Sequence, residues 1–83
     1  MLEIKVLYFA AVRELLGYAE ESLKLPDSVE SVGDLIAYLT DRHPVLRGAF
    51  RGTRVSVNQA FADPSQRLAN ADVVGVIPPV AGG

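Results

Sequence analysis

The sequence predicts an α+β fold, in which one main helix covers one face of a mixed sheet of four or five strands. Short segments of alternating apolar and polar residues recur along the chain, as in half-buried strands. Two segments change to the helical period, one directly after the first strand and one near the middle of the chain. The last alternating segment is highly apolar, which predicts a central strand.

The first strand is expected over residues 2–9, which are rich in Ile, Val, Tyr and Phe. Successive side chains of a strand point to opposite faces. One face would carry Leu2, Ile4, Val6 and Tyr8, and the other would carry Glu3, Lys5, Leu7 and Phe9.

A helix of two turns is expected over residues 10–16, with Gly17 as its C-terminal cap. Val12, Leu15 and Leu16 lie at helical spacing in it. A helix this short is not stable alone in water, so we expect it to dock on the sheet.

Further along the chain, a second strand is expected over residues 20–25 and the main helix over 31–43. Ser31 and Asp34 have the spacing of a capping box, and Pro44 ends the helix. A buried stripe of the helix consists of Val32, Leu35, Ile36 and Leu39.

The second half of the chain is expected to complete the sheet. Residues 45–52 form a loop with an irregular turn, and residues 53–59 form a third strand with Val55 and Val57 facing inward. A short strand or turn follows over 59–62, and the last strand covers 72–78. Ubiquitin-like β-grasp is the architecture that best accommodates this order, and the fold alone does not give a function.

Composition excludes several classes of function. A length of 83 residues predicts one domain over 1–83, with residues 79–83 as a flexible C-terminal tail. The net charge of −2 disfavours nucleic-acid binding and attachment to a membrane surface. The chain has no cysteine, so disulfides and thiolate metal sites are excluded, and we expect no metal. It shows no signal peptide or membrane span, which predicts a cytoplasmic protein.

The tail carries the strongest hint of chemistry. Pro78 and Pro79 cannot donate hydrogen bonds to a sheet, so regular pairing should stop there. Gly82 and Gly83 cost more backbone entropy to order than any other pair of residues. Their physical advantage is that, without a Cβ, they give the chain a small cross-section. Such an end can thread a narrow channel and bring its carboxylate to another protein. The alternative for Gly-Gly alone is a frayed end.

The whole chain resembles the small subunit of molybdopterin synthase. Three stretches carry the resemblance, namely residues 4–17 (the IKVLYFA strand end and the VRELLG helix), 57–59 (VNQ) and 72–83 with the end PPVAGG. The Phe-Ala step into the Arg-Glu-Leu helix and the Pro-Pro-Val-x-Gly-Gly end are specific together and weak apart. Residues 42–53 are less typical of the family.

The resemblance implies a ubiquitin-like sulfur carrier of molybdenum cofactor biosynthesis. A ubiquitin-activating-like adenylyltransferase would use ATP to adenylate the Gly83 carboxylate, and a sulfurtransferase would convert the adenylate to a thiocarboxylate. The tail of Pro79, Val80, Ala81, Gly82 and Gly83 would then enter the large synthase subunit. There it would give sulfur to cyclic pyranopterin monophosphate, in an assembly of two small and two large subunits.

On this reading the chain is no enzyme on its own and binds no permanent cofactor. It has no phosphate-binding loop, no paired metal ligands and no nucleophile-base set, so the catalytic groups belong to the partners. The alternatives are a related carrier for thiamin or tRNA thiolation, a protein modifier, or an interaction module with an idle tail. The helix over 10–17 favours the molybdopterin reading, since thiamin carriers have a plain hairpin there.

A second candidate site is the sheet face opposite the main helix. Apolar side chains are expected there at Leu7, Phe9, Val73 and Ile77, and Phe61 could join them. Such a cluster usually marks an interface, and the resemblance implies docking of the large subunit. Lys5, on the same face as Phe9, is a candidate for its rim, and Arg13, on the exposed side of the first helix, could pair with an acidic patch of a partner. A solvated side chain is the plainer interpretation of both. The alternative is that the short helix and loops cover this face.

Overall fold

The computed structural model describes residues 2–48 and 52–79. Within these ranges the chain forms β1 (Leu2–Tyr8), α1 (Ala10–Leu16), β2 (Glu20–Leu25), α2 (Val32–Arg42), a 3-10 turn η1 (Pro44–Leu46), β3 (Arg54–Val57), β4 (Ala60–Phe61) and β5 (Val73–Ile77). The strands form one mixed sheet in the order β2-β1-β5-β3-β4, in which only β1 and β5 run parallel. This confirms the predicted α+β class with β5 at the centre.

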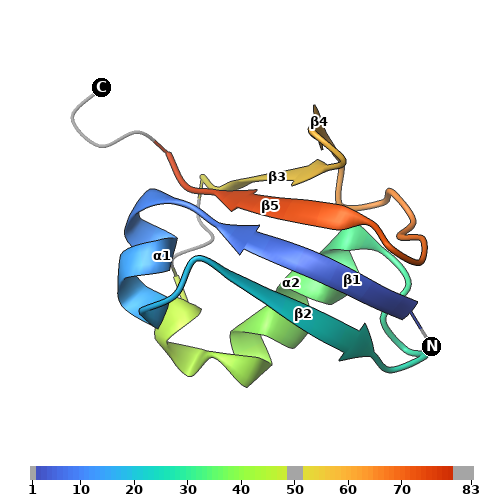
Figure 1. Ribbon diagram of the computed structural model, residues 1–83, viewed down its shortest axis with the longest axis horizontal. Helices are drawn as coiled ribbons and strands as arrows, with labels where there is room; N and C mark the ends of the chain where they lie inside the picture. Colours follow the sequence, from blue (N-terminus) through green and yellow to red (C-terminus); the bar gives the residue numbers. More distant parts are fainter. Residues whose placement is uncertain (1, 49–51, 80–83) are drawn as a thin grey trace.

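The core lies between this sheet and the helices, which occupy the same side of it (Figure 1). The inward face of the sheet supplies Ile4, Val6, Tyr8, Leu23, Leu25, Val55, Val57, Val74 and Val76, all buried. Facing them, α2 supplies Val32, Leu35 and Leu39, which are each 1% exposed. The predicted alternation of both faces is therefore confirmed, and neither of the helices in residues 2–48 and 52–79 covers the opposite face of the sheet (Figure 1).

The main helix begins where its sequence predicts. Ser31 Oγ accepts a hydrogen bond from the Asp34 backbone N–H at 3.2 Å, and Asp34 Oδ2 accepts one from the Ser31 N–H at 3.2 Å. This reciprocal pair satisfies two of the N–H groups that a helix start leaves open.

The short helix α1 differs from expectation in how it docks. Val12 is buried, Leu16 is partly buried, but Leu15 is 47% exposed. The helix lies beyond the end of β1 and contacts η1 and β5, so only one of its sides meets the protein. Leu46 of η1, in the segment expected to be a loop, is fully buried against this region.

The junctions of the fold use residues in the left-handed region. Gly17 ends α1 with φ of 85° and its N–H donates to Arg13 O at 2.9 Å. Asn58 and Gln59 have φ of 51° and 73°, the conformation that a tight two-residue hairpin requires. The third strand, predicted over 53–59, therefore ends at Val57, and a turn at Asn58 and Gln59 joins β3 to β4. Among the described residues, neither helix has the length and apolar character to cross a bilayer.

Candidate functional site

The open face of the sheet carries an apolar groove with a volume of about 580 Å³. Strands β1, β5 and β3 and the hairpin that leads to β4 form its walls. The lining residues are Leu7, Phe9, Ser56, Asn58, Gln59, Phe61, Val73, Gly75 and Ile77. The structure therefore brings together all five apolar residues predicted for this face, from three parts of the chain.

Phe9 lies over the middle of β5 because Gly75 leaves room for its ring. A Cβ at Gly75 would lie 3.3 Å from Phe9 Cε2 and 2.5 Å from Ser56 Oγ. The Phe9 N–H donates to Val76 O at 3.3 Å, and Ala10 takes a positive φ of 49° as the chain turns straight into α1. The abrupt step from strand to helix thus fixes Phe9 on the groove, where 42% of it stays exposed.

Phe61 forms the opposite wall and has little packing of its own. It is 64% exposed, more than any other large apolar residue among the described ones. The guanidinium carbon of Arg54 lies 5.0 Å from its ring centroid, a distance at which cation and ring attract each other. Phe61 is therefore an exposed apolar side chain with a cation beside it.

The two cations predicted for a partner interface occupy different places. Lys5 lies on the open face, opposite Val73 in the β1–β5 register, and its Nζ pairs with Glu20 Oε2 at 3.1 Å. Arg13 is exposed on α1 and does not line the groove. The structure thus places Lys5 beside the groove and leaves Arg13 apart from it.

The tail leaves the fold at one end of the groove. Ile77 is the last residue of β5 and lines the groove, and Pro79 beyond it is exposed. A Cβ at Gly52 would lie 3.6 Å from Pro79 Cγ, so the segment before β3 runs beside the base of the tail. The predicted tail residues Val80, Ala81, Gly82 and Gly83 lie outside the described residues.

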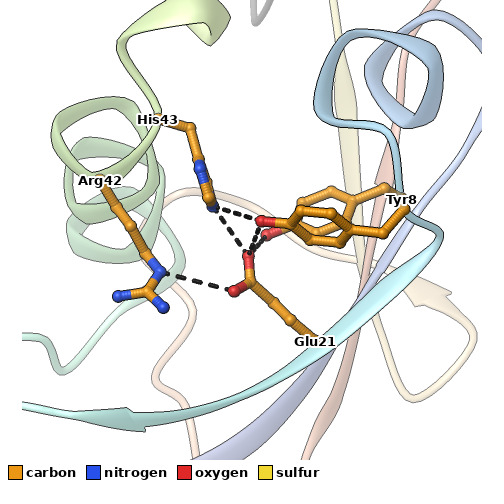
Figure 2. Close-up of polar contacts among 5 residues, drawn as sticks. Tyr8, Glu21, Arg42 and His43 are labelled. Atoms are coloured by element: carbon orange, nitrogen blue, oxygen red, sulfur yellow. Dashed lines mark hydrogen bonds and ion pairs between the residues drawn. The ribbon is translucent and has the colours of Figure 1, made fainter.

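A cluster of polar side chains lies on the other side of the sheet, where β1, β2 and the end of α2 meet. Figure 2 shows Tyr8, His43 and Arg42 converging on Glu21. Tyr8 Oη donates to Glu21 Oε2 at 2.5 Å, and His43 Nε2 lies 2.9 Å from the same oxygen. Arg42 Nε lies 3.4 Å from Glu21 Oε1. Tyr18 Oη completes the cluster, 3.1 Å from His43 Nε2.

The protonation states in this cluster suit a structural role. Burial raises the pKa of Glu21, but hydrogen bonds from Tyr8 and His43 and the charge of Arg42 outweigh it, and the net pKa is lowered. Burial and then the bond to Glu21 raise the pKa of Tyr8 far above its ordinary range, and burial raises the pKa of Tyr18. At neutral pH the carboxylate is ionised and both phenols are protonated, so the cluster ties elements together.

No set of three or more His, Cys, Asp or Glu side chains suited to a metal ion occurs within residues 2–48 and 52–79. The groove itself is lined by apolar and uncharged polar residues. The groove therefore has the apolar character that is typical of docking surfaces.

Comparison with known proteins identifies the family of this chain. The sequence profile of the ThiS family matches residues 6–83. The chain belongs to the ThiS family. Two relatives are named molybdopterin synthase sulfur carrier subunit. The one from Chlamydomonas reinhardtii is 36% identical over 84 residues, covering 99% of this chain and 100% of the relative. The one from Mycobacterium tuberculosis is 37% identical over 84 residues and covers both chains completely.

Solved structures of two other proteins share the fold of this ThiS-family chain. A Pyrococcus furiosus protein assigned as molybdopterin converting factor subunit 1 matches with a TM-score of 0.85 and 33% identity, covering 96% of this chain and 100% of that one. SAMP1 from Haloferax volcanii matches with a TM-score of 0.85 and 25% identity, covering 98% and 99%. The ubiquitin-like fold predicted from the order of elements is thereby confirmed.

Sequence reasoning missed two features of this ThiS-family chain. The first is the polar cluster around Glu21, which shares the inward face of β2 with Leu23 and Leu25. An acidic residue at a position where the alternation predicts an apolar one was the signal for it. Gly75 within an apolar strand was the signal for close approach of another group, here the ring of Phe9.

Proposed function

We propose that this chain is the sulfur carrier subunit of a molybdopterin synthase and works through the carboxylate of Gly83. The observation that carries the proposal is the junction of site and tail, because the apolar groove reaches Ile77 and the chain continues from there to Gly-Gly. The full-length similarity to sulfur carrier subunits in two organisms supports it.

The chemistry follows from what a carboxylate lacks. A carboxylate is a poor acyl electrophile, so an activating partner would let it attack ATP, releasing pyrophosphate and leaving an acyl adenylate. Sulfur at the sulfide level, supplied by a sulfurtransferase, would then attack the acyl carbon and expel AMP. The sulfur of the resulting thiocarboxylate is a better nucleophile than the oxygens of the hydroxyls and carboxylates that the chain itself carries. The absence of cysteine fits a carrier whose sulfur is held at the terminus.

The groove would hold the body of the chain against the large subunit. Exposed aromatic side chains that line a groove, such as Phe9 and Phe61, are enriched in the centres of protein interfaces. With the body docked, the thin Gly-Gly end would reach the active site in which cyclic pyranopterin monophosphate receives its sulfur. The active site is then shared between two chains, and the ATP site belongs to the activating enzyme.

Mass spectrometry of the intact chain tests this function directly. When the chain is co-expressed with an activating enzyme and a sulfurtransferase, we expect a species heavier by about 16 Da, since one oxygen is replaced by sulfur. Mixing this species with the large subunit and the pterin precursor should return the original mass and yield molybdopterin. If no heavier species forms and a strain without the chain still makes molybdenum cofactor, the proposal is wrong.

Phe61→Ala is expected to weaken binding of the large subunit about tenfold, because an exposed aromatic anchor at the groove would be lost. Its free energy of unfolding should barely change, since the side chain is 64% exposed in the free chain. Titration calorimetry against the large subunit measures the affinity. Val45→Ala is the matched control, because Val45 is 54% exposed in η1, away from the groove. Equal affinities of both variants would contradict the docking role.

A protein modifier is the second candidate, favoured by the structure of SAMP1, a small archaeal modifier protein, with its TM-score of 0.85. In that case the activated Gly83 would form amide bonds with lysines of other proteins. An affinity-tagged chain would then appear in high-mass conjugates that resist reducing agents, whereas a sulfur carrier gives only the thiocarboxylate.

A further inference from the structure

The wall of the groove that carries Phe61 stands on a very short strand. Strand β4 has only two residues, Ala60 and Phe61, paired to β3 at Val57 and Ser56. Neither β4 residue is buried. Beyond these two residues, the Ala62 N–H donates to Val55 O at 2.9 Å. Because β4 is so short and lies at the edge of the sheet, contacts outside β4 must help to keep Phe61 in place.

Asn58 supplies that support through its side chain. The residue lies in the left-handed region, with φ of 51°, where the hairpin turns away from β5. Its N–H still donates to Val73 O at 2.8 Å, and its Oδ1 accepts from the Val73 N–H at 2.9 Å. The side-chain oxygen thus replaces the backbone carbonyl of Asn58 itself as the acceptor. The β3–β5 pairing is thereby extended by one residue pair, Asn58 with Val73.

Asp72 holds the other end of the Asn58 side chain. Asn58 Nδ2 donates to Asp72 Oδ1 at 2.9 Å, and Asp72 Oδ2 accepts from the Ala69 N–H at 2.8 Å. Asp72 is 8% exposed and is the only charged residue buried to this degree in the described part of the chain. Both of its oxygens are used as acceptors, so the Asn58–Asp72 clamp joins the hairpin to the loop before β5.

We propose that Asn58 and Asp72 are positioning residues for partner docking, because their clamp holds the β3–β4 hairpin in the orientation that presents Phe61 to the groove. Asn58 also lines the groove, so its effect must be separated from direct contact with a partner. Asp72 does not line the groove. If the clamp acts by positioning the hairpin, substitution of either residue should weaken partner binding in the same way.

An exchange of the two side chains provides the sharpest test. In N58D two carboxylate oxygens would face each other, and in D72N an amide donor would face either Asn58 Nδ2 or the Ala69 N–H. Each single variant therefore breaks one bond of the clamp. The double variant N58D/D72N restores all of them, because the amide at position 72 donates to the carboxylate at position 58, accepts from Ala69, and leaves Val73 its acceptor.

The first readout is hydrogen exchange in the free chain and needs no partner. The Ala62 N–H, which donates to Val55 O at 2.9 Å, reports on the hairpin, and the Tyr8 N–H, bonded to Ala19 O at 2.7 Å, serves as reference. We expect Ala62 exchange to quicken by about tenfold relative to Tyr8 in each single variant and to recover in the double variant. Unchanged Ala62 exchange in N58D and D72N would overturn the clamp.

The second readout is affinity for the large subunit, and it rests on the proposed function. Each single variant should bind about fivefold to tenfold more weakly, and N58D/D72N should regain most of the loss. In a Phe61→Ala background the single variants should lose less than about twofold, since they act through Phe61. Equal losses in both backgrounds would overturn the positioning role. If the unaltered chain binds no large subunit, the proposed function fails, and the exchange result alone decides the clamp.

Discussion

Deletion of Gly83 is expected to abolish thiocarboxylate formation while leaving the fold intact. The shortened chain would still end in glycine, but its carboxylate would fall about 3.5 Å short of the activating centre. A displacement of even 1 Å at a reacting group can cost about a hundredfold in rate. The buried core extends only from Ile4 to Val76, so the free energy of unfolding should change by less than about 0.5 kcal/mol.

Intact-mass measurement after co-expression with the activating enzymes checks this loss, and urea unfolding checks the fold. Lys24→Ala is the control, because Lys24 lies on the edge strand β2, opposite Glu3 near the start of β1 and far from the exit of the tail. That variant should gain sulfur normally. A shortened chain that still gained sulfur would show that Gly83 does not carry it. Retained affinity for the large subunit would separate docking through the groove from chemistry at the tail.

Local patterns predict the elements of this fold well, because each has its signal within a few residues. The capping box at Ser31 and Asp34 fixes the start of α2, and alternation assigns the faces of β1 and β5. The apolar character of β5 predicts its central place, confirmed by its pairing with both β1 and β3. The gathering of Leu7 and Ile77 on one face follows from the same alternation.

The features that local patterns did not predict depend on contacts between distant segments. Leu15 is at helical spacing but exposed, because α1 docks beyond the end of β1 and not flat on the sheet. The contact of Phe9 with Gly75 needs the parallel β1–β5 register, which joins residues far apart in the chain. Likewise, His43 meets Glu21 only once the end of α2 is packed beside β2. Tertiary packing decides these positions.

Glu21→Gln is expected to lower the free energy of unfolding by about 2 kcal/mol, which corresponds to a fall in Tm of about 10 °C for a domain of this size. The Glu21 side chain is 14% exposed and joins Tyr8 in β1 to His43 and Arg42 at the end of α2. A glutamine could still accept from Tyr8, but it has no charge for Arg42. Thermal and urea unfolding of both proteins at neutral pH measure the loss.

Glu20→Gln is the matched control, because Glu20 is the neighbouring acid on the opposite face of β2. Its carboxylate pairs with Lys5 at 3.1 Å, but its side chain is 55% exposed, and such pairs contribute less than about 1 kcal/mol. We therefore expect this variant to unfold close to the unaltered chain. Equal losses for Glu20→Gln and Glu21→Gln would show that the cluster contributes no more than an exposed ion pair.

The pH dependence identifies the charge on Glu21 as the cause. Its pKa is lower in the folded chain than in the unfolded chain, where a glutamate titrates near about 4.3. The stability it contributes is therefore complete above that value and is lost as the pH falls through the lower pKa of the folded state. The difference between the unaltered chain and Glu21→Gln should shrink as the pH falls below about 4.3. The partners of Glu21, namely Tyr8, Tyr18, His43 and Arg42, all remain in the variant. If the difference in unfolding free energy stayed constant over this range, its cause would be packing and not the charge of Glu21.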